Sequence, residues 1–181
     1  MKTHKLSLSL LALLVVGTFI GCSTSTKSPD VSASIRKSLD QAGLKDVTVS
    51  QDRDKGVVTL GGHVAVEADK AQAESLAKSI AAEQVVANQI AVTPPGVEGD
   101  AKTVNSDLDS GIEKNLDAAL VTNRLHKGVK FDVKNGVVTL TGDVKSKNQR
   151  TLAENAASSV PNVKQVVNEL EIKKPKATSS K

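Results

Sequence analysis

Few residues in this chain have side chains that could carry out chemistry, and their spacing does not match a catalytic or metal site. The sequence contains one cysteine, Cys22, and three histidines, of which His63 and His126 lie beyond the N-terminal segment. Neither histidine has a cysteine, a second histidine or a carboxylate at the spacing of a metal site. Serine and threonine are abundant, but no motif places a general base near one of them. We therefore predict no catalytic residue, no metal site, no cofactor and no small-molecule substrate.

Basic side chains are the second group of chemical interest, because they bind phosphate and other anions through charge-assisted hydrogen bonds. They gather in two runs in the C-terminal half of the chain. The candidate anion-binding residues are Arg124, Lys127, Lys130, Lys134, Lys147 and Arg150. The alternative is that these side chains form only the solvated rim of a small domain.

The overall charge argues against nucleic acid as a partner. The chain of 181 residues has 24 Lys and Arg and 20 Asp and Glu, a net charge of +4. Two of the positive charges, Lys2 and Lys5, lie in a segment that we expect to be removed, which leaves the rest nearly balanced. Proteins that bind nucleic acid concentrate positive charge instead.

The N-terminal segment has the pattern of a secretory signal. A basic start is followed by an apolar run of 15 residues at positions 6–20, and then by Gly21 and Cys22. A run this short, ending in small residues, indicates a signal peptide over residues 1–21 rather than a membrane span. The polar residues 22–30 are expected to form a tether.

The residues before the only cysteine resemble the lipobox of bacterial lipoproteins, with the match Phe19-Ile20-Gly21-Cys22. The resemblance implies that Cys22 becomes the lipid-attached first residue of the mature protein, and that Ser23 favours sorting to the outer membrane. The alternative is an ordinary cleaved signal followed by a chance cysteine.

An internal repeat organises the rest of the chain. Residues 56–64 read GVVTLGGHV and residues 136–144 read GVVTLTGDV, an offset of 80 residues. We predict one domain over residues 31–93 and a second over 107–172, joined by a Pro- and Gly-containing linker at 94–106. Residues 173–181 are expected to form a basic, disordered tail.

Each repeat is predicted to be a small α+β unit with the element order αββαβ. Apolar residues recur at helical spacing before the repeated strand, as in Leu108, Ile112 and Leu116, and again after it. Asn135-Gly136 is a strong hairpin signal, so the repeated strand should pair antiparallel with the strand before it. The crossover helix makes the last strand parallel. Two helices should therefore cover one face of a three-stranded mixed sheet.

Several further residues of the repeats are expected to be structural. Ser146 and Gln149 have the spacing of a capping box at the start of the second helix. Gly62 and Gly142 are expected to allow a bulge or the close packing of the following segment. Asn88 and Asn168 recur at one position of the last strand and should project toward the helices, bonded to backbone groups of the nearby loop.

The two repeats resemble BON domains, a module of periplasmic and outer-membrane proteins induced by osmotic stress. The resemblance rests on the pattern G-x-V-x-L-x-G-x-V at 56–64 and 136–144, and on V-x-N-x-[IL]-x-[VI] at 86–92 and 166–172. The layout of lipobox, tether and two units is similar to that of dual-BON outer-membrane lipoproteins. It is also similar to that of soluble, osmotically inducible periplasmic members.

This resemblance implies a non-catalytic envelope lipoprotein that binds anionic phospholipid surfaces and supports outer-membrane integrity or osmotic-stress tolerance. In the dual-BON lipoproteins, lipid contact is attributed to the second unit near its first helix, and by this resemblance the candidate basic residues would be headgroup ligands. The expected location is the periplasmic side of the outer membrane, with a soluble periplasmic protein as the alternative. A rival interpretation is a scaffold for envelope proteins, which would use the sheet face around Thr59, Thr139, Lys130 and Asp132.

Overall fold

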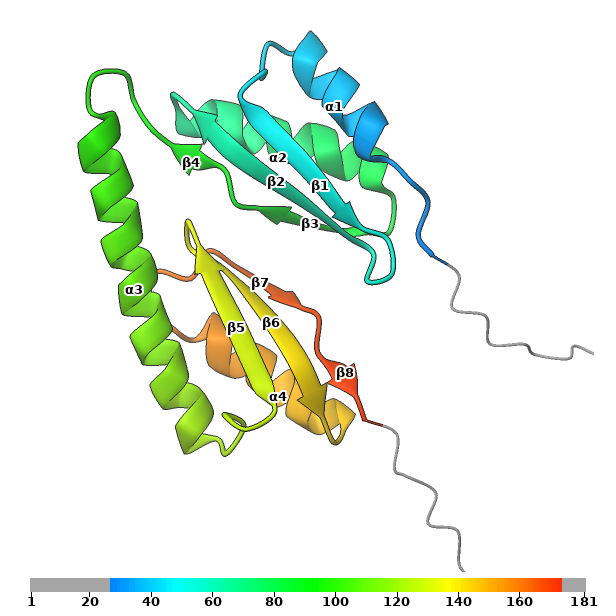
Figure 1. Ribbon diagram of the computed structural model, residues 1–181, viewed down its shortest axis with the longest axis vertical. Coiled ribbons are helices and arrows are strands. Elements are labelled where there is room, and N and C mark those ends of the chain that lie inside the picture. Colours follow the sequence, from blue (N-terminus) through cyan, green and yellow to red (C-terminus); the bar gives the residue numbers. More distant parts are fainter. Residues whose placement is uncertain (1–26, 174–181) are drawn as a thin grey trace, which may run out of the picture.

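The structure, a computed structural model, describes residues 27–173, in which one α+β unit occurs twice (Figure 1). Repeat one consists of α1 (Ser32–Gln41), β1 (Val47–Asp52), β2 (Val57–Val64), α2 (Glu67–Ala81), β3 (Val85–Asn88) and β4 (Ala91–Val92). Repeat two consists of α3 (Glu98–Thr122), β5 (Val129–Lys134), β6 (Val137–Val144), α4 (Lys147–Ser158), β7 (Gln165–Asn168) and β8 (Glu171–Ile172). Cys22, the predicted signal peptide and nearly all of the predicted basic tail lie outside the described residues.

The sheet topology confirms the predicted αββαβ unit. In repeat one, β1 pairs antiparallel with β2, and β3 and β4 pair parallel with β2. Repeat two has the same arrangement, with β6 in the middle. The predicted last strand is broken in each repeat after an asparagine. The Asn88 side chain accepts from the N–H of Ile90 at 3.4 Å, which turns the backbone away from the ladder.

The core of each repeat lies between its sheet and its two helices. In repeat one, Val58 and Leu60 of β2 are fully buried against Ala73 and Ala77 of α2. Alanine on the inner face of the helix lets the helix axis lie close to the sheet. Val138, Leu140, Ala153 and Ala157 occupy the equivalent positions in repeat two. The shared alternation of buried and exposed residues therefore builds two cores of the same kind.

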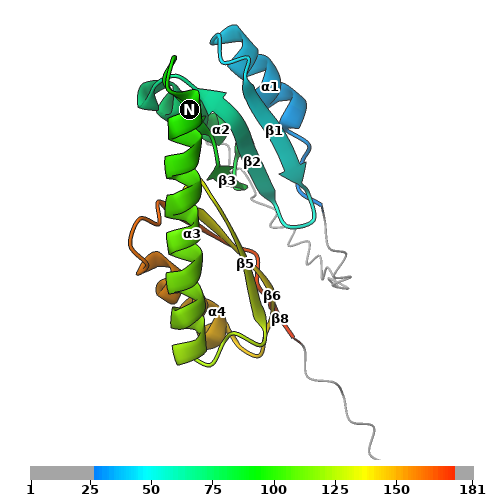
Figure 2. The same ribbon diagram turned by 60° about the vertical axis from the view of Figure 1, so that its left-hand side comes forward.

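The helix α3 departs from the prediction, because most of the expected linker at 94–106 is helical. It begins at Glu98 and runs for 25 residues beside both repeats (Figure 2). Pro94, Pro95 and Gly96 all precede this start, and residues 98–122 contain no proline to stop a helix. The Glu98 carboxylate also accepts the N–H of Gly96 at 2.8 Å. Leu108, expected to face the core, is 44% exposed, so the buried face of α3 starts at Ile112.

The two repeats contact each other through the sheet faces that their helices leave open. Val57 and Ala87 of repeat one form a buried cluster with Val137 and Val167 of repeat two. These four residues are two pairs separated by the repeat offset, so like surfaces meet like surfaces, as in a two-fold dimer. The scaffold hypothesis requires this face to be free, and part of it is already covered by the other repeat.

Polar contacts at both ends of this cluster follow the same symmetry. The Lys55 ammonium in the β1–β2 turn bonds the Glu169 carboxylate at 2.8 Å. The Asn135 side chain in the β5–β6 turn donates to the carbonyl of Gln89 at 2.8 Å. Each turn therefore contacts the residue that follows the third strand of the other repeat.

Gln165 contributes a contact that has no counterpart in repeat one, where Val85 occupies its place. Its side-chain amide donates to the carbonyl of Val86 at 2.7 Å and accepts from the N–H of Asn88 at 3.1 Å. These two backbone groups flank Ala87 on the outer edge of β3. The amide of Gln165 therefore satisfies an edge that would otherwise be open to another strand.

Candidate functional site

Arg124 has an unusual backbone conformation at the end of α3. Its φ angle is +57°, in the left-handed region of the backbone that residues other than glycine rarely adopt. The matching position after α1 is Gly43, with φ of +81°. The two positions are equivalent because Leu44 and Leu125, which follow them, donate to the carbonyls of Leu39 and Leu120. Repeat two thus retains an arginine where the backbone favours glycine.

This arginine lies at the rim of a cavity of about 630 Å³ in repeat two, which we call the basic pocket. The pocket lies between the loop after α3, the β5–β6 hairpin and the start of α4. Five basic side chains and one carboxylate line it: Arg124, Lys127, Lys130, Lys145, Lys173 and Asp143. The pocket therefore presents a concentrated positive charge, although the charges of repeat two as a whole are balanced.

Most of the basic side chains of the pocket are not neutralised within the protein. Lys173 lies 3.5 Å from the Asp143 carboxylate. Among residues 27–173, none of Arg124, Lys127, Lys130 and Lys145 forms a salt bridge. The charge of these four side chains is available to an external anion.

Repeat one has the same backbone frame with less positive charge, because its matching loop has Lys45 beside Asp46 where repeat two has Lys127 beside Gly128. Lys130 of β5 is opposite Thr141, the residue before Gly142. The equivalent residue of β1 is Thr48, which is opposite Gly61 and is uncharged. Lys145 follows Val144, where repeat one has Ala65 after Val64. Together with Arg124 in place of Gly43, these differences confine the basic pocket to one of two otherwise similar units.

Glycines hold the frame of the pocket. Gly142 has φ of +108°, and a Cβ atom there would overlap the carbonyl oxygen of Gly128. Gly62 has φ of +83°, and its Cβ would overlap the carbonyl of Asp46. Close packing at these glycines was predicted, but it involves the loop before the first strand rather than the segment after the second. The reason is that these loop carbonyls accept from Asp143 and His63, the residues after the glycines.

The structure brings together three of the six candidate basic residues and separates the other three. Arg124, Lys127 and Lys130 line the basic pocket. Lys134 lies at the opposite end of β5 and lines a different cavity, shared with repeat one. Lys147 and Arg150 are exposed on α4 and do not line the basic pocket. Lys145 and Lys173 also line it. Lys145 belongs to the second basic run of the sequence but was not among the six candidates, and Lys173 was missed because its closeness depends on how β6 and β8 pair.

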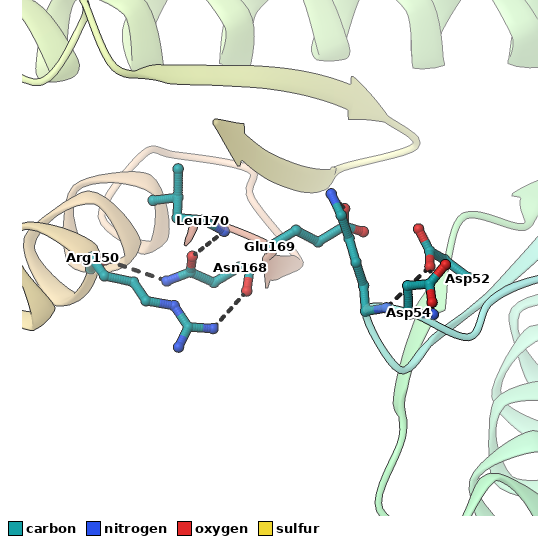
Figure 3. Close-up of polar contacts among 7 residues, drawn as sticks. Asp52, Asp54, Arg150, Asn168, Glu169 and Leu170 are labelled. Carbon is teal, nitrogen blue, oxygen red and sulfur yellow. Dashed lines mark hydrogen bonds and ion pairs between the residues drawn. The ribbon is translucent and has the colours of Figure 1, made fainter. Parts of the chain in front are cut away.

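Arg150 has a structural contact instead. Its guanidinium donates to the carbonyl of Asn168 at 3.0 Å, and its own carbonyl accepts from the Asn168 side chain at 3.3 Å (Figure 3). The Asn168 amide also donates to Glu154 at 2.9 Å, and its oxygen accepts from the N–H of Leu170 at 3.2 Å. The prediction that Asn168 is a lock between strand and helix is confirmed, although helix groups as well as loop backbone are its partners.

The equivalent lock in repeat one is buried. Asn88 donates to the carbonyl of Lys70 at 3.3 Å and to the Glu74 carboxylate at 2.9 Å. Partial burial alone would raise the pKa of Glu74, but the hydrogen bonds from Asn88 and Lys78 outweigh it and hold that pKa below its ordinary value. Asn88 thus fixes both the chain geometry and the charge of its partner.

Other features that bear on function are the helix starts, the histidines and possible metal ligands. Ser146 caps α4 by accepting from the N–H of Gln149, as predicted, while the Gln149 side chain accepts from the backbone N–H of Lys145 rather than from that of Ser146.

His63 and His126 are exposed. In the part of the chain that the structure describes, no three His, Cys, Asp or Glu side chains gather as metal ligands. Among the helices of residues 27–173, none is long and apolar enough to span a bilayer.

Comparison with known proteins gives two matches in sequence. The family model described as "BON domain" matches residues 28–94 and again residues 108–174. The osmotically inducible protein Y of Escherichia coli is 32% identical over 146 residues, which cover 79% of this chain and 71% of that protein.

Among solved structures, two chains of CdsD, a structural protein of the type III secretion system of Chlamydia trachomatis, show a distant likeness. One is 15% identical with a TM-score of 0.35, and it covers 77% of this chain and 90% of that one. The other, a C-terminal domain of CdsD, is 14% identical with a TM-score of 0.32, and it covers 78% of this chain and 67% of that one. At these scores the likeness carries no argument about function.

Proposed function

The chain belongs to the BON-domain family and contains two BON domains, and from this premise we propose that it is a non-catalytic envelope protein whose second domain binds anionic phospholipid headgroups. Its role is to support the integrity of the envelope under osmotic stress. The relative from Escherichia coli, whose name describes it as osmotically inducible, supports the connection with stress.

The observation that carries this proposal is the basic pocket itself. Arg124, Lys127, Lys130 and Lys145 point to an anionic partner, because they share one cavity and form no salt bridge within residues 27–173. Phospholipid phosphates match these side chains, which offer several N–H donors close together. The matching end of repeat one has uncharged residues at the places of Arg124, Lys130 and Lys145, which favours a function acquired by one domain over a general need of the fold.

The expected affinity of the pocket for lipid is low. Each basic residue close to an anionic surface adds about 1 kcal/mol, so four residues correspond to a dissociation constant of about 1 mM. The part of repeat two that the structure describes offers no aromatic side chain to insert beside the pocket, since Phe131 packs against the core. The pocket can therefore select a surface but needs a second device to stay on it.

We assign that second device to Cys22, which lies outside the described residues. A lipid attached there would hold the chain to the periplasmic face of the outer membrane far more firmly than the lysines could. Tethering would also raise the effective concentration of headgroups around the basic pocket, so that weak contacts are occupied. The competing location is a soluble periplasmic protein in which the pocket acts alone.

A scaffold for other envelope proteins is the second candidate function. One observation favours it: the side chains of Lys130 and Asp132 on β5 are exposed and therefore accessible to a partner. The interface between the repeats counts against it, because part of the open sheet face is already covered. We therefore rank the scaffold below lipid binding.

Charge reversal in the pocket tests the proposal. In the chain that keeps Cys22, Lys127→Glu with Lys130→Glu should change the distribution of the protein within the envelope, while Lys37→Glu with Lys45→Glu in repeat one should leave it unchanged. The four lysines are exposed, so neither pair should unfold the protein. An unchanged distribution of the pocket variant would contradict a role of Lys127 and Lys130 in membrane binding.

Labelling with a fatty-acid analogue tests the anchor separately. The wild-type chain should incorporate the label, and the Cys22→Ser chain should not. Equal incorporation would place the lipid on a residue other than Cys22, and no incorporation by the wild type would leave the soluble location as the better description.

A further inference from the structure

A second cavity with unpaired positive charge lies between the two repeats. Its volume is about 320 Å³, and we call it the inter-repeat cavity. One face of α2 in repeat one, from Glu67 to Lys78, forms one wall, and Val137, Lys164 and Gln165 of repeat two form the other. Its charged lining comprises Glu67, Lys70, Glu74 and Lys78 from repeat one and Lys164 from repeat two.

Lys70 is the unusual member of this group. It is only 6% exposed, and its ammonium nitrogen has no hydrogen-bond partner in the described part of the chain. Burial of an ammonium without a partner is costly, and native structures normally supply a carboxylate or a ring of acceptors. The burial of Lys70 therefore requires an explanation beyond packing.

Comparison with repeat two shows that the neighbouring repeat is what encloses Lys70. Arg150 is the equivalent residue, and the carbonyls of Lys70 and Arg150 accept from Asn88 and Asn168 at the same distance of 3.3 Å. Arg150 is exposed and its guanidinium has a partner, the Asn168 carbonyl. No repeat covers that side of α4, whereas Val137, Lys164 and Gln165 cover α2 at Lys70. The enclosed lysine is thus a product of the interface.

The groups that face Lys70 do not neutralise it. The Glu74 carboxylate is engaged by Asn88 and Lys78, and the Asp109 carboxylate accepts from the N–H groups of Asn135 and Gly136. Glu67 lies exposed at the edge of the cavity. Burial first, and then the positive charge of Lys164, lower the pKa of Lys70. Two ammonium groups, one from each repeat, therefore share a cavity without a bonded carboxylate.

We propose that the inter-repeat cavity binds a phosphate-class oxyanion between the ammonium groups of Lys70 and Lys164. A phosphate carries several strong acceptor oxygens, so one ion can accept hydrogen bonds from both lysines at once. Because the two lysines belong to different repeats, the bound ion also links the repeats. This site is separate from the basic pocket, which lies at the far end of repeat two and shares none of its lining.

Binding of inorganic phosphate to the full-length chain in a non-ionic detergent tests the proposal. We expect a dissociation constant in the millimolar range, with changes in the amide NMR signals of Lys70, Val137 and Gln165. The melting temperature should rise with phosphate, because a ligand that binds only the folded state stabilises it. Dihexanoyl phosphatidic acid, a soluble lipid with the same headgroup chemistry, forms the second arm. A response to phosphate indicates a free ion, and a response to the lipid alone indicates a headgroup.

Three variants separate binding from folding. Lys70→Met removes the buried ammonium but keeps the length of the side chain, so the protein should fold and lose about tenfold in affinity or more. Lys164→Gln changes an exposed residue and should cause a similar loss. Lys78→Met, a lysine of the same cavity that is already paired with Glu74, should cause much less.

Two results would overturn this site. One is the absence of any response of the cavity residues to either probe. The other is equal phosphate binding by the wild-type, Lys70→Met and Lys164→Gln chains, because the ion would then bind elsewhere.

Discussion

At the scale of single residues, both proposed binding sites contain a residue that differs from its counterpart in the other repeat. Arg124 occupies a left-handed position where Gly43 stands in repeat one, and it lines the basic pocket. Lys70 is enclosed without a partner, where Arg150 is exposed and bonded. Both residues are costly for the fold, and strain or burial of this kind is typical of sites that bind something.

Replacing Arg124 by glycine should therefore stabilise the protein and weaken its binding to anionic lipid. Relief of the left-handed conformation should add about 1 kcal/mol to the free energy of unfolding. Loss of one cation should lower vesicle affinity severalfold. Urea unfolding and vesicle binding measure the two effects. The reciprocal variant, Gly43→Arg, should destabilise repeat one. If Arg124→Gly lowered stability or left binding intact, the special position of this arginine would be structural.

The pH dependence of stability should reveal the buried lysine. Enclosure lowers the pKa of Lys70 below its ordinary value of 10.5, and Lys164, Glu67, Glu74 and Asp109 are the charged groups near it. Between the lowered pKa and 10.5, the unfolded chain binds more protons at this position than the folded chain. The free energy of unfolding must then rise with pH in this window. Urea titrations should show this rise in the wild type and not in Lys70→Met. If the free energy of unfolding depended on pH in the same way in both chains, the Lys70 ammonium would be exposed to water and not buried.

At the scale of elements, α3 connects the repeats and positions the hairpin that follows it. The Asp109 carboxylate accepts from the N–H groups of Asn135 and Gly136, at 2.7 and 2.8 Å. Asn135 and Gly136 have φ angles of +52° and +81°, as the tight turn requires. The helix thus holds the same turn whose Asn135 side chain contacts repeat one.

Asp109→Ala should destabilise the protein by about 2 kcal/mol, because two backbone donors lose a charged acceptor. Asp107→Ala, an exposed position on the same helix, is the control and should change stability little. Urea denaturation compares them. Equal stability of the two variants would show that water replaces the Asp109 carboxylate without cost.

The sequence predicts local structure well and predicts contacts between elements poorly, as particular residues illustrate. Alternation in the repeated strand, the Asn135-Gly136 turn and the Ser146 cap are local signals, and all are confirmed. The prediction of where α3 begins was wrong. The polar residues after Gly96 suggested a linker, although such residues are also compatible with a helix exposed to water. The bonds from Asp109 to the β5–β6 turn and the place of Lys173 in the basic pocket depend on how distant elements pack. The local sequence pattern therefore predicts neither contact.

At the scale of the whole molecule, the interface between repeats resembles a two-fold dimer made within one chain. The valine and alanine cluster and the turn contacts follow the repeat symmetry, whereas Gln165 breaks it. The Gln165 contact covers the outer edge of β3, and the basic pocket lies apart from this interface, lined by residues of repeat two alone. The arrangement explains how two similar domains present different surfaces.

Gln165→Ala should loosen the repeats without unfolding either one. The backbone groups of Val86 and Asn88 would lose their partners, at a cost of about 1–3 kcal/mol. Hydrogen exchange at the amide of Asn88 should accelerate, and X-ray scattering should show a more extended particle. Gln72→Ala, an exposed site on α2, is the matched control. Unchanged exchange at Asn88 would mean that the apolar cluster alone holds the interface.

The most direct test of the proposed function is flotation with vesicles of the chain that lacks residues 1–21 and carries Cys22→Ser. Without an anchor, binding depends on the protein surface. We predict that the protein floats with vesicles of anionic phospholipid at low salt and not with zwitterionic vesicles. Lys127→Glu with Lys130→Glu should reduce the bound fraction at least tenfold, and Lys37→Glu with Lys45→Glu should not. Equal flotation of both variants, or no flotation of the wild type with anionic vesicles, would contradict lipid binding by the basic pocket.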